Sequence, residues 1–114
     1  MMPTIYKILP ITLWHEAKRA GVFRGAAIDL SDGYIHFSTA EQAEETAAKH
    51  FVGQRDLVLL HVDTATLGDA LKWEPSRGGA LFPHLYAGLD VKHVVRADPL
   101  PLGEDGRHVF PKLT

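Results

Sequence analysis

Cysteine is absent from this chain of 114 residues, which excludes disulfide bonds and thiolate metal sites. A chain of this length without such cross-links has the size of one domain with one core, because two smaller units could not each bury enough apolar surface. The apolar fraction of 46% suits a globular protein. We therefore expect a single domain over residues 1–114, with an irregular tail from about residue 99.

Long apolar runs and targeting signals are also missing. No stretch approaches the ~20 apolar residues that span a bilayer. The first residues, MMPTIYKILPITLW, contain neither a cluster of positive charge nor a small-residue cleavage site. We therefore expect a cytoplasmic protein that does not associate with membranes.

Runs of positive charge are absent as well. Lysine and arginine residues are scattered singly and the formal net charge is −2, whereas proteins that grip the phosphate backbone of nucleic acids carry basic runs or patches. This distribution argues against general nucleic-acid binding. It leaves a small molecule or a nucleotide as the expected partner of a monomer or weak homodimer.

Several signatures of known chemistry are lacking. The chain has neither of the glycine-rich phosphate-binding patterns, no HExxH pair and no G-x-S-x-G turn. Seven histidines are present, and a metal site would have to combine dispersed members of the set His36, His61, His84 and His93. Because none of them has the spacing of known ligand pairs, we expect no metal site.

Two segments carry helical signals. Residues 12–20 have an apolar stripe at helical spacing, with Thr12 as the expected N-cap and Gly21 as the terminator. Residues 40–51 follow a capping-box pattern that starts at Ser38 or Thr39. The intervening residues 24–33 are predicted to form a loop with short extended pieces.

The remaining apolar segments are predicted to be strands, at 4–9, 34–38, 56–63, 71–74, 81–86 and 91–97. The run 56–63 is the most apolar and is predicted to be a central, buried strand. The order of elements lacks the regular alternation of a parallel nucleotide-binding sheet. We therefore expect an α+β fold with a small, mostly antiparallel sheet and two helices, and a core that includes Ile35, Phe37, Leu57, Leu59 and Val62.

Strand alternation brings candidate site residues together. On the strand 34–38, His36 and Ser38 share one face, and their donors and acceptors suit a ribose or an amide. A local hydrogen bond of His36 and helix capping by Ser38 would explain them equally. His84 and Tyr86 also share a face, and we predict that these four side chains lie in one pocket.

Two carboxylates complete the set of candidates. Glu74 stands beside Trp73 at the end of a strand, where a raised pKa would suit an acid or a base; the alternative is a surface ion pair. His61 and Asp63 share a face of the central strand, either as a supporting couple or as the polar end of that strand.

In combination, the motifs DGYIHFST, DLVLLHVD, WEP and FPHLYAGL resemble the bacterial domain-of-unknown-function family 952, over about residues 5–99. That family is itself similar to the ADP-ribosyltransferase-like fold, and especially to RNA 2′-phosphotransferases. The resemblance implies a split β-sheet with a cleft for a nicotinamide dinucleotide, and makes NAD a candidate cofactor. It places His36 and Ser38 on a His-x-Ser strand, and Lys7 where those enzymes have a histidine that contacts the adenine-side ribose.

For function, the resemblance implies ribosyl or phosphoryl transfer by a transferase. His36 would orient the ribose, Ser38 would hold the amide, and Glu74 or His84 would be the catalytic group. Lys7 in place of a histidine favours a different class, a binding module that kept the cleft and lost the chemistry. A third class, an interaction protein without a small ligand, would require an exposed apolar patch.

Overall fold

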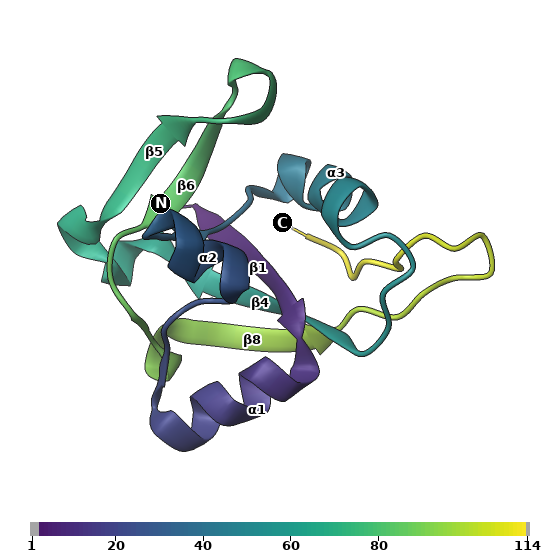
Figure 1. Cartoon of the computed structure of the whole chain (residues 1–114), viewed down its shortest axis with the longest axis horizontal. Coiled ribbons are helices and arrows are strands. Elements are labelled where there is room, and N and C mark those ends of the chain that lie inside the picture. Colours follow the sequence, from purple (N-terminus) through teal and green to yellow (C-terminus); the bar gives the residue numbers. More distant parts are fainter. Residues whose placement is uncertain (1–2, 114) are drawn as a thin grey trace.

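The computed structural model describes residues 3–113, which form an α+β fold of three small antiparallel sheets and three α-helices. In chain order the elements are β1 (Thr4–Pro10), α1 (Ile11–Ala20), β2 (Val22–Phe23), α2 (Ala27–Asp32), β3 (Ile35–His36), α3 (Ala40–His50), β4 (Leu57–Asp63), β5 (Leu71–Pro75), β6 (Leu81–Leu85), β7 (Leu89–Asp90) and β8 (Val94–Pro99) (Figure 1). Within this described range, no helix is both long and apolar enough to span a membrane.

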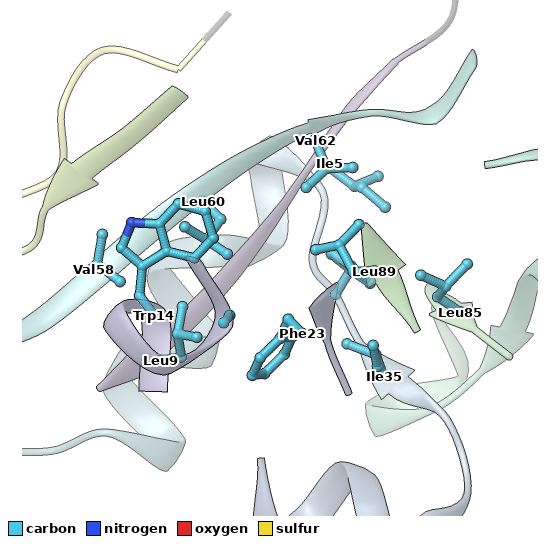
Figure 2. Close-up of a cluster of buried hydrophobic side chains, with 12 residues drawn as sticks. Ile5, Leu9, Trp14, Phe23, Ile35, Val58, Leu60, Val62, Leu85 and Leu89 are labelled. Carbon is cyan, nitrogen blue, oxygen red and sulfur yellow. The ribbon is translucent and has the colours of Figure 1, made fainter. Parts of the chain in front are cut away.

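The first sheet has the order β1-β4-β8 and holds the core. Its central strand β4 is buried from Leu57 to Val62 because both faces of the sheet are covered. One face packs with Trp14 of α1 and Phe23 of β2 (Figure 2), and the other packs against α3. The central strand is therefore confirmed, and its unbroken apolar run follows from burial on two sides. Burial is also confirmed for the five predicted core residues.

The second three-stranded sheet has the order β3-β6-β5, and β2 pairs with β7 in a sheet of two short strands. Within residues 3–113, a single isolated bridge connects the two larger sheets. Tyr6 N–H donates to the Ser38 carbonyl at 2.8 Å, and Ser38 N–H donates to the Tyr6 carbonyl at 2.9 Å. The hairpin β5–β6 extends from the body beside α3 (Figure 1), where Gln42 Nε2 donates to the Leu81 carbonyl at 2.8 Å.

The predicted helices at 12–20 and 40–51 are confirmed as α1 and α3. Thr12 was the wrong N-cap, because α1 already begins at Ile11 after an extended Pro10. The Ile11 N–H donates to the Asp56 carbonyl at 2.8 Å. One amide that usually needs a side-chain cap is thus satisfied by the segment preceding β4.

The predicted loop at 24–33 was wrong, because residues 27–32 form the helix α2. Its six residues are too few for an apolar period to be visible in the sequence. The helix is stabilised instead by Asp29, whose Oδ2 accepts the Ala26 N–H at 2.8 Å. Gly25 allows Asp29 to come this close: its φ is +125°, and a Cβ there would lie 2.8 Å from Asp29 Cβ.

Two further details correct the predicted architecture. The arrangement is three small sheets and three helices, where one small split sheet and two helices were expected. The last strand begins at Val94, three residues later than predicted, since residues 91–93 form a turn. Asp90 holds that turn by accepting the Lys92 N–H at 3.0 Å.

Candidate functional site

A cavity of about 700 Å³ opens between β1, α2, α3 and the β6 strand. Apolar side chains form much of its wall, among them Ile8, Leu13, Ile28, Phe51 and Phe82. The polar side chains that line it include Lys7, Asp32, His36, Ser38 and His84. A volume of this size, with apolar walls and a few convergent polar groups, is typical of a small-molecule site.

Asp29 is the centre of a group of polar contacts that includes the cavity-lining residues Lys7 and His36. Its side chain is 1% exposed and accepts four donors: Lys7 Nζ, the backbone N–H groups of Ala26 and His36, and His36 Nδ1. Burial by itself would raise the pKa of the carboxyl. The hydrogen bond from His36, the charge of Lys7 and the two backbone bonds outweigh burial and lower the pKa to about 2.

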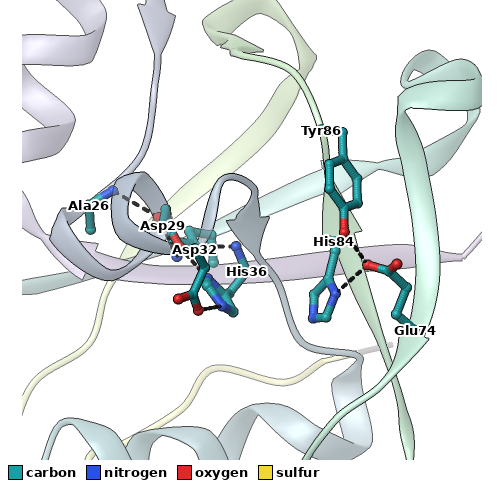
Figure 3. A network of polar contacts seen from close by, with 8 residues as sticks. Ala26, Asp29, Asp32, His36, Glu74, His84 and Tyr86 are labelled. Atoms are coloured by element: carbon teal, nitrogen blue, oxygen red, sulfur yellow. Dashed lines mark hydrogen bonds and ion pairs between the residues drawn. The ribbon is translucent and has the colours of Figure 1, made fainter.

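His36 is held between two carboxylates. Its Nδ1 lies 2.6 Å from Asp29 Oδ1, and its Nε2 lies 2.9 Å from Asp32 Oδ2 (Figure 3). An ionised carboxylate only accepts hydrogen bonds, so in each of these contacts the ring nitrogen is the donor. Both ring nitrogens of His36 are therefore hydrogen-bonded within the protein.

Lys7 is buried beside Asp29. Only 7% of its side chain is exposed, and its Nζ lies 3.0 Å from Oδ1 and 2.9 Å from Oδ2 of Asp29. Burial lowers the pKa of the ammonium group, while the charge and the hydrogen bond of Asp29 oppose that shift. Lys7 thus lines the cavity, and its amine has an anionic partner.

Glu74, His84 and Tyr86 form a separate group on the β5–β6 hairpin (Figure 3). The carboxylate oxygen Oε1 of Glu74 lies 2.9 Å from His84 Nδ1 and accepts the Tyr86 hydroxyl at 2.7 Å. These hydrogen bonds, from Tyr86 first and from His84 second, lower the pKa of Glu74. The expected raised pKa was therefore wrong, because the neighbours of this carboxylate are donors. The same bond raises the pKa of Tyr86 to about 12.

His84 differs from His36 in its hydrogen bonding. Its side chain is only 4% exposed, and its ring lines the cavity. Because Nδ1 faces a carboxylate, that nitrogen carries a proton, and in the neutral ring Nε2 is an acceptor. Among the residues that the structure describes, Nε2 has no hydrogen-bond partner.

Tyr34 joins the two histidines. Its ring centroid lies 4.6 Å from that of His36, 4.2 Å from that of His84 and 5.1 Å from that of Tyr86. Sequence reasoning missed the importance of Tyr34, Asp29 and Asp32. The two aspartates stand three residues apart, a spacing that places them on one side of a helix, but only once α2 is recognised as helical.

The prediction of one shared pocket holds for three of four residues. His36, Ser38 and His84 line the cavity, and the rings of the two histidines are 5.5 Å apart. Tyr86 is wrong as a member of this set, because it is not among the residues that line the cavity and is 46% exposed. Ser38 does not cap α3; its hydroxyl is 2.8 Å from that of Thr46, and the N-cap is Thr39.

The pair of His61 and Asp63 is not formed. His61 Nε2 contacts Asp98 Oδ2 at 2.8 Å on the neighbouring strand, and Asp63 accepts the Ala65 N–H at the start of a turn. Alternation placed both side chains on one face but gave no information about the partner strand. Within residues 3–113, no group of three or more potential ligands could hold a metal ion.

Comparison with known proteins gives a family and a set of close structures. The family model described as "Protein of unknown function (DUF952)" matches residues 8–97. The crystal structure of protein CC0527 from Caulobacter crescentus is similar, with 56% identity over 93% of each chain and a TM-score of 0.90. A solution NMR structure of the same protein gives 57% identity over 91% of this chain and 90% of that one, with a TM-score of 0.83. No curated protein matches the chain. These matches provide no support for an ADP-ribosyltransferase-like fold.

Proposed function

The chain belongs to the family described as "Protein of unknown function (DUF952)", and we propose that it binds a small organic molecule in the cavity. In this proposal His84 is the group that exchanges a proton with the ligand, and Glu74 orients it. The apolar wall supplies contact area, and the polar groups select the ligand.

One observation carries the proposal, namely the state of the His84 ring. His36, whose side chain is 29% exposed, has a carboxylate at each of its two ring nitrogens. His84 has a carboxylate at Nδ1 and presents its ring to the cavity. A carboxylate at one nitrogen fixes the tautomer and makes the other nitrogen a base for a neighbouring group.

NAD does not fit the polar groups that the resemblance assigns to it. The Lys7 ammonium is paired with Asp29, and the Ser38 hydroxyl is bonded to Thr46. His36 has carboxylates at both nitrogens. Because these groups are satisfied within the protein, we derive no ribosyl transfer from NAD.

A binding module without chemistry is the second candidate. It is favoured by the same internal contacts, since three of the polar residues at the cavity are fixed by bonds to the protein. Such a rigid wall suits recognition of one molecular shape. The two candidates differ in what His84 does, and one set of variants separates them.

The test is a fragment screen by NMR on the full chain, followed by affinity measurements with the best binder. We expect the binder to shift the His84 ring signals. We expect His84→Gln to weaken binding by about tenfold or more, since one buried hydrogen bond and its partner are lost. His15→Gln is the matched control, because His15 is exposed on α1 away from the cavity lining.

Glu74→Gln separates the two candidates, because the amide keeps an acceptor for His84 but removes the charge. If the ligand is converted, turnover falls while affinity is retained; a binding module shows affinity alone. Absence of any binder that shifts the His84 signals, or unchanged affinity in His84→Gln, would contradict the proposal.

A further inference from the structure

Lys7 is an unusual residue for its position. It lies in the middle of β1, between Tyr6 and Ile8, and faces Leu60 across the sheet register. Buried ion pairs are generally no more stable than apolar side chains of the same volume. The fold therefore gains little from an amine here.

The surroundings of Lys7 suit a different use of that amine. Lys7 and His84 line the same cavity, and the cavity has an apolar wall. Burial favours the neutral, nucleophilic form of a lysine, and His84 offers an acceptor nitrogen. Asp29 stands at 2.9–3.0 Å as a fixed counter-charge.

We propose that Lys7 forms an imine with the carbonyl carbon of an aldehyde or ketone bound in the cavity. This inference rests on the proposed function, because it uses the same cavity and names the class of its ligand. Lysine amines in desolvated sites are the usual nucleophiles for carbonyl compounds.

The step is balanced without another reactant. The Lys7 ammonium first gives one proton to the acceptor nitrogen of His84, and the neutral Lys7 nitrogen then forms a bond to the carbonyl carbon. The carbonyl oxygen leaves as water, with the proton returned by His84 and one hydrogen from the Lys7 nitrogen. The product is an iminium ion that keeps one positive charge and one N–H. Asp29 pairs with the positive charge of the ammonium group before the step and with that of the iminium ion after it.

The test is reductive trapping on the full-length wild-type chain. The protein is incubated with butanal and cyanoborohydride at neutral pH, digested, and each lysine is quantified by mass spectrometry. We expect Lys7 to be alkylated at least about tenfold faster than Lys49, because burial favours a neutral amine. Lys49 is the internal control, being exposed and paired with a carboxylate, Glu45, at 3.4 Å.

Two further measurements make the outcome decisive. Lys7→Arg keeps the charge beside Asp29 but cannot form an imine, so the fast-reacting site disappears while Lys49 reacts as before. Alkylation of Lys7 no faster than that of Lys49 would overturn the inference. If butanal without reductant still shifts the His84 signals in that case, the proposed function stands and only the imine is wrong.

Discussion

At the scale of single residues, Asp29 connects more of the site than any other side chain described above. It accepts donors from β1, from the start of α2 and from β3. The carboxylate therefore determines where Lys7 and His36 lie. Its charge also balances Lys7 within a buried environment, so the stability of the fold depends on its ionisation.

Asp29→Asn is expected to lower the free energy of unfolding by about 3–5 kcal/mol, because it leaves the Lys7 ammonium buried without a counter-charge. The folded pKa of Asp29 is about 2, below the ordinary 3.8. The contribution of this pKa shift to the free energy of unfolding, about 2.5 kcal/mol, is therefore complete above about pH 4. It is lost as the pH falls through 2. Urea unfolding at pH 7, 4 and 2 measures both effects.

Asp69→Asn is the control for Asp29→Asn, because Asp69 is exposed. Its free energy of unfolding should equal that of the wild type at each pH. A difference between wild type and Asp29→Asn that stays constant from pH 7 to pH 2 would contradict this account of Asp29.

The Glu74 carboxylate is expected to determine the ionisation of Tyr86. Its hydrogen bond and charge raise the pKa of Tyr86 to about 12. In Glu74→Gln the pKa should fall towards the ordinary value of ~10, because the amide accepts a weaker bond and carries no charge. An NMR titration of the Tyr86 ring measures this, with His15→Gln as control. An unchanged pKa of Tyr86 would show that the hydrogen bond between Glu74 and Tyr86 is not formed in solution.

At the scale of elements, strand alternation predicted much of the site and helix periodicity predicted less. The two-residue repeat is sufficient to place His36 and Ser38 on one face and Ile35 and Phe37 on the other. Pairing of β3 with β6 then brings His84 opposite His36. A six-residue helix such as α2 is too short to show a comparable repeat. The contact that stabilises it, from the Ala26 N–H to the Asp29 carboxylate, is not visible in the sequence pattern. The aspartates of the site could therefore not be predicted.

The approach of α2 to the preceding turn makes Gly25 sensitive to substitution. Gly25→Ala should destabilise the fold by about 3 kcal/mol, because the new Cβ meets Asp29 Cβ at 2.8 Å and φ is +125°. Gly53→Ala is the matched control: its φ is +70° and nothing lies within 4 Å, so the expected cost is about 1 kcal/mol. Thermal or urea unfolding compares them, and equal losses would be inconsistent with this close approach.

At the scale of the whole molecule, composition and apolar patterning predicted the α+β class, the two long helices and the central strand. They did not predict the division into three sheets. That division depends on which edges pair over long separations, for example β1 with β4 and β3 with β6. Long-range pairing is determined by tertiary packing, and a single sequence contains little direct signal for it.

The bridge between Tyr6 and Ser38 has a consequence for cooperativity. Across residues 3–113, it supplies the two backbone hydrogen bonds that join the sheet of Lys7 to the sheet of His84. Apolar packing supplies the rest of the connection, because Ile35 and Leu85 of one sheet lie in the same buried cluster as Ile5 and Leu60 of the other. A ligand that contacts both Lys7 and His84 would connect the two sheets through the cavity. Binding of that ligand and cooperative unfolding of the whole domain would then be one coupled equilibrium.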